Sequence, residues 1–147
     1  MSTTVLRTMW VHGHSLQIED HDALVSHWRS GFCLYVEGKP DSLNWLHASI
    51  PTPGSAGDRP RRIGAVMITG CTMSNDAIVR DIHVYDGDIK IGDINDVNLS
   101  GDIGMVRFTL LDHPEVHTAI GISLGLSFGA ASLPHGISIT AVGAEFV

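Results

Sequence analysis

The 147-residue sequence carries few charges, and most of them are negative. Charged residues make up 17% of the chain, with 9 Lys and Arg against 16 Asp and Glu, which gives a formal net charge of −7. Such an excess of negative charge repels phosphate backbones and anionic lipid headgroups. We therefore expect no nucleic-acid partner and no membrane partner.

Cysteine and long apolar segments are scarce as well. The two cysteines, Cys33 and Cys71, do not make a disulfide framework and are expected to be small buried residues. Residues 1–14 lack the apolar stretch of a signal peptide, and the glycine-rich apolar run over residues 119–131 is too short to span a bilayer. These absences predict a cytoplasmic protein.

What the chain does have is apolar residues at close, regular spacing. Hydrophobic residues make up 44% of it, and a chain of this length buries roughly 68–70% of its unfolded surface. Because no repeat or linker interrupts the pattern, we predict a single domain over residues 1–147.

Short runs with strand-like alternation recur along the chain, separated by turn residues such as Asp86-Gly87. We count about nine of them, over residues 9–18, 32–37, 43–50, 63–69, 78–85, 89–91, 106–110, 118–130 and 136–147. Many short strands at this spacing are typical of sandwiches and barrels. We predict an all-β fold, either an antiparallel two-sheet sandwich of the jelly-roll type or a flattened barrel, with at most one short helix.

Residues 20–29 fit two structures. Asp20 as an N-terminal cap favours a short helix, whereas the alternation of Leu24, Ser26 and Trp28 favours a strand. The pattern does not decide between them.

The run from Ile120 to Phe128 alternates large apolar residues at even positions with small residues at odd positions: Gly121, Ser123, Gly125, Ser127 and Gly129. In a strand these two sets face opposite sides of the sheet, so one face fills a core and the other is almost bare. A bare face is covered by a ligand, by another sheet or subunit, or by a large side chain from a neighbouring strand. A homo-oligomer is one of these outcomes.

Nine histidines are the most unusual feature of the composition. His12 and His14 have a spacing that can share a metal on one face of a strand, with His47 or His83 as a third ligand. Glu19 follows this pair, but not at the tight spacing that a specific metal motif has. Since histidine pairs on strands are more often a polar face, we predict no bound metal and no other cofactor.

Asp81, His83 and Tyr85 are predicted to share one strand face, where a carboxylate can orient an imidazole for general base catalysis. With His47 these residues are the catalytic candidates. The sequence has no nucleophile elbow of the Gly-x-Ser-x-Gly type, and a solvated strand face explains the same pattern.

Tryptophans next to polar residues suggest binding of a sugar or another small ring, although tryptophans in a sandwich core give the same pattern. The candidate ligand-binding residues are Trp10, His12, Trp45, Ser123 and Ser127.

Two charged clusters have a functional and a structural interpretation. Six aspartates between residues 81 and 102 suggest calcium, but aspartate is favoured in turns in any case. Arg59, Arg61 and Arg62 lie in a Pro- and Gly-rich loop that either meets an anionic group or is simply solvated.

Several short motifs resemble a family of small bacterial proteins of unknown function. They are MWVHG (9–13), NWLH (44–47) followed by IPTP (50–53), HVYDG (83–87), LSGD (99–102) and GISLGLSFGA (121–130). The resemblance implies an all-β fold and brings no activity or catalytic residue. It directs attention to the motif residues His12, Trp45, His47, His83, Tyr85 and Asp86.

Four functions fit these observations. The first is a cofactor-independent cyclase or isomerase that holds a small molecule in an apolar pocket and uses His and Asp as acid and base. The second is a non-catalytic binding module for carbohydrate or another small ligand, with or without calcium. The others are a His-ligated metalloenzyme and a protein that pairs with a second subunit through its Gly/Ser face.

Overall fold

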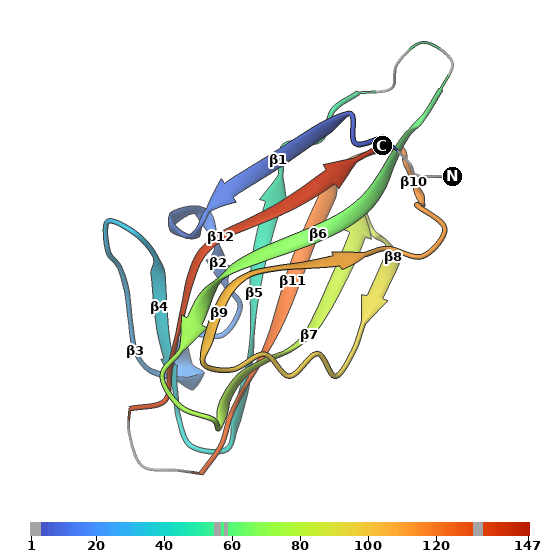
Figure 1. Ribbon diagram of the computed structural model, residues 1–147. Coiled ribbons are helices and arrows are strands. Elements are labelled where there is room, and N and C mark those ends of the chain that lie inside the picture. The colour runs from blue at the N-terminus through green and yellow to red at the C-terminus, as the bar shows by residue number, and fades with distance from the viewer. Residues whose placement is uncertain (1–3, 55–56, 58, 131–133) are drawn as a thin grey trace.

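The computed structural model describes residues 4–54, 57, 59–130 and 134–147, and these residues form two antiparallel sheets that face each other (Figure 1). The seven-stranded sheet contains β1 (Arg7–His12), β3 (Leu24–Arg29), β4 (Leu34–Gly38), β6 (Arg61–Thr72), β9 (Asp102–Thr109), β10 (Glu115–Val116) and β12 (Gly136–Phe146). The five-stranded sheet has the order β2 (Gln17–Ile18), β5 (Ser42–Ile50), β11 (Ile120–Phe128), β7 (Ala77–Asp86) and β8 (Ile89–Ile94). The predicted sandwich is confirmed, and the sheets do not close into a barrel.

The seven-stranded sheet is built around β12. On one side β12 pairs with β6, and on the other it pairs with β1 and then with β4, which lie end to end. Strand β3 pairs with β4 at the edge of the sheet, and β9 and β10 pair with β6. In Figure 1 this sheet lies in front of β5, β11 and β7. Among the described residues, no helix is long and apolar enough to cross a membrane.

The described residues contain twelve strands rather than about nine. The run over residues 9–18 is not one strand, because a 3₁₀ turn at Gly13–Ser15 separates β1 from β2. A side chain at Gly13 would bring its Cβ within 2.0 Å of the Ile139 carbonyl oxygen. This close approach lets the chain leave one sheet and enter the other. The prediction that His12 and His14 share a strand face is therefore wrong.

Residues 20–29 combine parts of both expected structures. Asp20 caps a one-turn 3₁₀ helix at His21–Ala23, where its carboxylate accepts from the backbone N–H of Asp22 at 3.1 Å. The chain then extends into β3. The strand is thus the structure that residues 24–29 adopt, and the helical cap serves only the turn before it.

The core lies between the sheets, and β11 contributes to it as the alternation predicts. Its five even-numbered side chains are each no more than 2% exposed: Ile120, Ile122, Leu124, Leu126 and Phe128. The run over residues 63–69 is buried on both faces from Ile63 to Ile68, as its continuous apolar pattern predicts. In β7 the predicted alternation holds from Asp81 onward, where the even-numbered residues are buried. Before Arg80 the odd-numbered residues are buried instead, because the pairing with β11 skips Arg80.

The β7–β8 hairpin turns at Gly87, which has a φ of +59°, as the Asp-Gly pair predicts. Asp86 precedes this turn and is 5% exposed. Its carboxylate accepts from the backbone N–H groups of His117 and Thr118, both at 2.8 Å. Burial alone would raise the pKa of Asp86, but these hydrogen bonds and the nearby His117 ring outweigh burial and hold the pKa below its ordinary value of 3.8.

The substitution Asp86→Asn should lower the free energy of unfolding by about 2 kcal/mol at neutral pH, because one of the two backbone donors loses its charged acceptor. Since the pKa is lowered in the folded state, the carboxylate stabilises the fold fully above about pH 4 and loses this effect as the pH falls further. Urea unfolding at pH 7 and pH 3 measures both effects.

The exposed neighbour Asp88→Asn is the control for loss of charge. A difference between wild type and Asp86→Asn that is as large at pH 3 as at pH 7 would contradict this role for the carboxylate.

Candidate functional site

A row of polar residues crosses the outer face of the five-stranded sheet. The strand registers place one residue from each strand side by side, in the order Gln17, His47, Ser123, His83 and Asp93. Adjacent strands lie about 4.8 Å apart, and His47 and His83 are on the two strands that flank Ser123. The backbones of His47 and His83 are therefore separated by about twice this spacing. Even-numbered neighbours of this row point into the core, and the row therefore faces solvent.

A cleft of about 600 Å³ opens over this row. Its floor is Gly121, where an added Cβ would meet nothing closer than the Ala48 carbonyl oxygen at 4.0 Å. Gly125, four residues further along the same strand, is covered instead, because an added Cβ would lie 3.0 Å from the Trp45 indole. The cleft is lined by Gln17, Glu19, Trp45, His47, Ala48, Ser49, His83, Tyr85, Gly121, Ile122 and Ser123.

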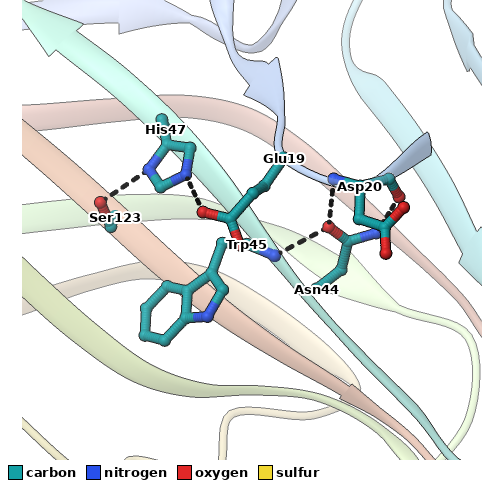
Figure 2. Close-up of polar contacts among 6 residues, drawn as sticks. All are labelled: Glu19, Asp20, Asn44, Trp45, His47 and Ser123. Carbon is teal, nitrogen blue, oxygen red and sulfur yellow. Dashed lines mark hydrogen bonds and ion pairs between the residues drawn. The ribbon is translucent and has the colours of Figure 1, made fainter. Parts of the chain in front are cut away.

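His47 is held between a hydroxyl and a carboxylate (Figure 2). Its Nδ1 lies 2.8 Å from Ser123 Oγ, and its Nε2 lies 2.9 Å from Glu19 Oε1. An ionised carboxylate can only accept, so Nε2 carries a proton, and in a neutral ring Nδ1 then accepts from the Ser123 hydroxyl. The contacts of His47 thus fix both the orientation of the ring and its tautomer.

The buried Asn44 holds the segment that carries Glu19. Its side-chain oxygen accepts from the backbone N–H groups of Asp20 and Trp45, and its Nδ2 donates to the Asp20 carbonyl at 2.7 Å. The backbone N–H of Glu19 donates to the Trp45 carbonyl at 3.0 Å. Figure 2 shows the contacts of Asn44 beside the His47 pair. The chain on either side of Glu19 is therefore fixed against β5.

His83 has its own carboxylate, and this is Asp93 on β8. His83 Nε2 lies 3.2 Å from Asp93 Oδ1, and Lys90 Nζ lies 3.0 Å from Asp93 Oδ2. The hydrogen bond from Lys90 lowers the pKa of Asp93, and Asp93 in turn raises the pKa of Lys90. The Trp45 and His83 rings are 4.8 Å apart.

Asp81, predicted to orient His83, has other contacts. Its Oδ1 accepts from the backbone N–H of Asp96 at 3.0 Å, and its Oδ2 lies 3.7 Å from Arg80 Nε. In the part of the chain that the structure describes, Asp93 is the carboxylate that pairs with His83. The short-range pattern Asp-x-His pointed to the wrong partner, because the strand pairing brings in a residue ten positions away.

The predicted site residues separate into two groups. His47, His83, Tyr85, Trp45 and Ser123 line the cleft. Ser127 lies on the same strand beyond the register shift at Gly125 and is not part of the cleft lining. Trp10 and His12 lie on β1, in the opposite sheet.

The two metal arrangements considered as alternatives from the sequence do not form among the described residues. No three His, Cys, Asp or Glu side chains of that part of the chain are placed to hold an ion. His12 Nδ1 instead accepts from the backbone N–H of His14 at 3.1 Å. Most of the clustered aspartates act as acceptors in turns or ion pairs, as Asp86, Asp93 and Asp102 show.

The basic loop also has structural contacts. Arg61 donates to the Gly54 carbonyl, and Arg62 donates to the His113 carbonyl and to Glu115. These two arginines tie the loop to the ends of the strands.

The sandwich is similar to two solved structures of known description. A low-affinity xylan-binding module of family CBM86 from the gut symbiont Roseburia intestinalis aligns with a TM-score of 0.58 at 15% identity, over 96% of both chains. A cyclase from Fischerella sp. TAU aligns with a TM-score of 0.50 at 10% identity, over 92% of this chain and 87% of that chain. At these identities the similarity shows the fold alone.

No curated protein matches the sequence. The model of a family of unknown function, DUF6623, matches residues 4–147. This match agrees with the resemblance of the sequence motifs to an all-β family without an assigned activity. The chain therefore belongs to the family of unknown function DUF6623.

Proposed function

We propose that the cleft over Gly121 binds a small neutral ligand built of saccharide-like rings. The observation that carries this proposal is the empty floor at Gly121, bordered by hydrogen-bonding side chains and by two aromatic residues. A ring can approach the backbone there because no side chain fills the space. The indole of Trp45 and the ring of Tyr85 offer flat apolar faces, which suit the C–H faces of a sugar.

The polar groups of the cleft favour a ligand with hydroxyls and no negative charge. His47, Ser123 and His83 form an unbroken hydrogen-bonding edge along the floor, and Gln17 extends it. Glu19 and Asp93 stand at the two ends of this edge and repel an anion. The fold that the chain shares with a xylan-binding module is consistent with a carbohydrate, and the cleft geometry gives the proposal its location.

The substitution Gly121→Val should weaken ligand binding and leave the fold intact. The added Cβ projects into the cleft and comes no closer than 4.0 Å to the Ala48 carbonyl oxygen. We expect the affinity for a saccharide identified on a glycan array to fall at least about tenfold, because overpacking of a filled site costs 1–3 kcal/mol. Titration calorimetry measures the affinity.

Gly31→Ala is the matched control, since Gly31 is exposed and an added Cβ there has no neighbour within 4 Å. Thermal unfolding should show that Gly121→Val is at least as stable as wild type, because glycine weakens a strand. Gly31→Ala lies in the connection between β3 and β4 and should be as stable as wild type. If wild type binds no saccharide on the array, or if Gly121→Val binds as wild type does, the proposal is wrong.

A second function is favoured by a separate observation, the two imidazole–carboxylate pairs that flank Ser123. In a cofactor-independent isomerase or cyclase, one imidazole removes a proton from the ligand while the other returns a proton at a neighbouring atom. We assign these two roles to His47 and His83, with Tyr85 as a further hydrogen-bond donor. Each imidazole already has the carboxylate that orients it. The fold shared with a cyclase is consistent with this function.

Catalysis of this kind should exchange a carbon-bound proton of the bound ligand for deuterium in D₂O. We expect wild type to exchange it and His47→Gln and His83→Gln to do so about 10²–10⁴-fold more slowly, since that is the usual contribution of a positioned acid or base. Proton NMR of the ligand follows the exchange, and calorimetry shows whether each variant still binds. Absence of exchange in wild type would leave binding without catalysis as the function.

A further inference from the structure

The outer face of the seven-stranded sheet carries a second set of rings, which includes the two predicted ligand-binding residues that lie far from the cleft. We define this ring strip as Trp10, His12, His14 and Trp28. Trp10 pairs with Gly143 of β12 and His12 pairs with Ala141, while Trp28 pairs with Tyr35, which itself pairs with Ser138 of β12.

The ring strip lies on one face because β12 contains a register shift. Val142 and Ala144 are fully buried in the core, so Gly143 points outward. Ile137 and Ile139 are also fully buried, so Ser138 points outward too. In a regular strand, the even-numbered Ser138 and the odd-numbered Gly143 would face opposite sides. The register shift between Ile139 and Ala141 changes which residues face outward, so that Ser138 and Gly143 lie on the same face. Measured along the direction of β12, the positions that pair with Trp10 and, through Tyr35, with Trp28 are about 13 Å apart.

Both indoles rest on other groups and keep one side open. An added Cβ at Gly143 would lie 2.7 Å from the Trp10 indole, which therefore covers this glycine. The Trp28 indole stacks on the Tyr35 ring, with 4.0 Å between centroids and 23° between planes. Trp10 remains 42% exposed and Trp28 51% exposed, although each buries one side of its ring. Indoles held flat in this way are prepared for a second ring to stack on them.

The two histidines connect the indoles. The rings of His12 and His14 are 4.0 Å apart, and His14 Nε2 hydrogen-bonds to the Ser30 carbonyl oxygen. Ser30 and Trp28 line the same hollow of about 340 Å³, together with the exposed Phe32. The ring strip thus has apolar ring faces at its two ends and two imidazoles in the space between them.

Three charged side chains near the ring strip, Arg29, Arg107 and Glu145, are already paired with other groups. The guanidinium of Arg29 donates to the carbonyl oxygens of His14 and Leu16. Arg107 and Glu145 form a two-bonded ion pair with each other. A surface of spaced rings, hydrogen-bonding groups and no unpaired charge among these residues fits a neutral chain of sugars better than a charged polymer or an aliphatic protein surface.

From this geometry we propose that the ring strip binds an extended neutral polysaccharide, at a site separate from the cleft. The spacing of Trp10 and Trp28 requires a chain of several sugars, whereas the cleft accepts a small ligand. The two sites lie on the outer faces of opposite sheets, so each can be removed without touching the other. The ring strip does not depend on the function proposed for the cleft.

The test is retention of the full chain on insoluble cellulose, xylan and chitin, with bound and free protein measured at equilibrium. Wild type should be retained on at least one of these polymers. Trp10→Leu combined with Trp28→Leu should lower the partition constant at least about tenfold, since stacking on two rings is lost. Leucine keeps apolar bulk at both positions, so the fold should remain, and thermal unfolding verifies this.

Leu111→Ala is the matched control for removal of an exposed apolar side chain, since Leu111 is 86% exposed and lies away from the ring strip. It should be retained as wild type is. Failure of wild type to bind any of the three polymers, or equal retention of the double variant, would overturn the proposal. Light scattering tests a different role for the ring strip. If wild type is a dimer and the double variant is a monomer, the ring strip is a subunit interface and the proposal is wrong.

Discussion

Strand β11 has to satisfy opposite demands on its two faces, and the rest of the molecule is arranged around this constraint. Its large even-numbered side chains fill the space between the sheets, and the core depends on them because they are almost completely buried. Its odd positions are glycine or serine, so the outer face has no bulk of its own. Strands β5 and β7 therefore supply the side chains that stand over it.

The two histidines beside Ser123 show how the site is assembled. Neither His47 nor His83 takes its carboxylate from its own strand, since Glu19 follows β2 and Asp93 lies on β8. Each pair is thus formed across strands, and each carboxylate sits at the margin of the sheet. Asn44 on β5 fixes the segment next to Glu19 through its hydrogen bonds to the Asp20 backbone. These contacts hold both rings in fixed orientations, so a ligand of the kind that we propose would not have to order them on binding.

A glycine beneath an indole occurs on both sheets. Trp45 covers Gly125 on the five-stranded sheet, and Trp10 covers Gly143 on the seven-stranded sheet. The glycine allows the indole to lie close to the backbone, and the indole in turn buries apolar surface that the glycine leaves open. Gly121 departs from this arrangement because no ring covers it. The difference between Gly121 and Gly125 is what turns part of an otherwise packed sheet face into a cleft.

The fold class, the packed and bare faces of β11 and the hairpin at Asp86-Gly87 could be predicted from the sequence alone, as could five of the residues that line the cleft. These features follow from the two-residue period of a strand and from turn chemistry, both of which are local. The tertiary structure decided which carboxylate pairs with which histidine, because strand register joins residues distant in sequence. It also decided that Trp10 and His12 face away from the cleft. The turn at Gly13 sends the chain to the other sheet there, and the close approach to Ile139 that requires this glycine exists only in the folded protein.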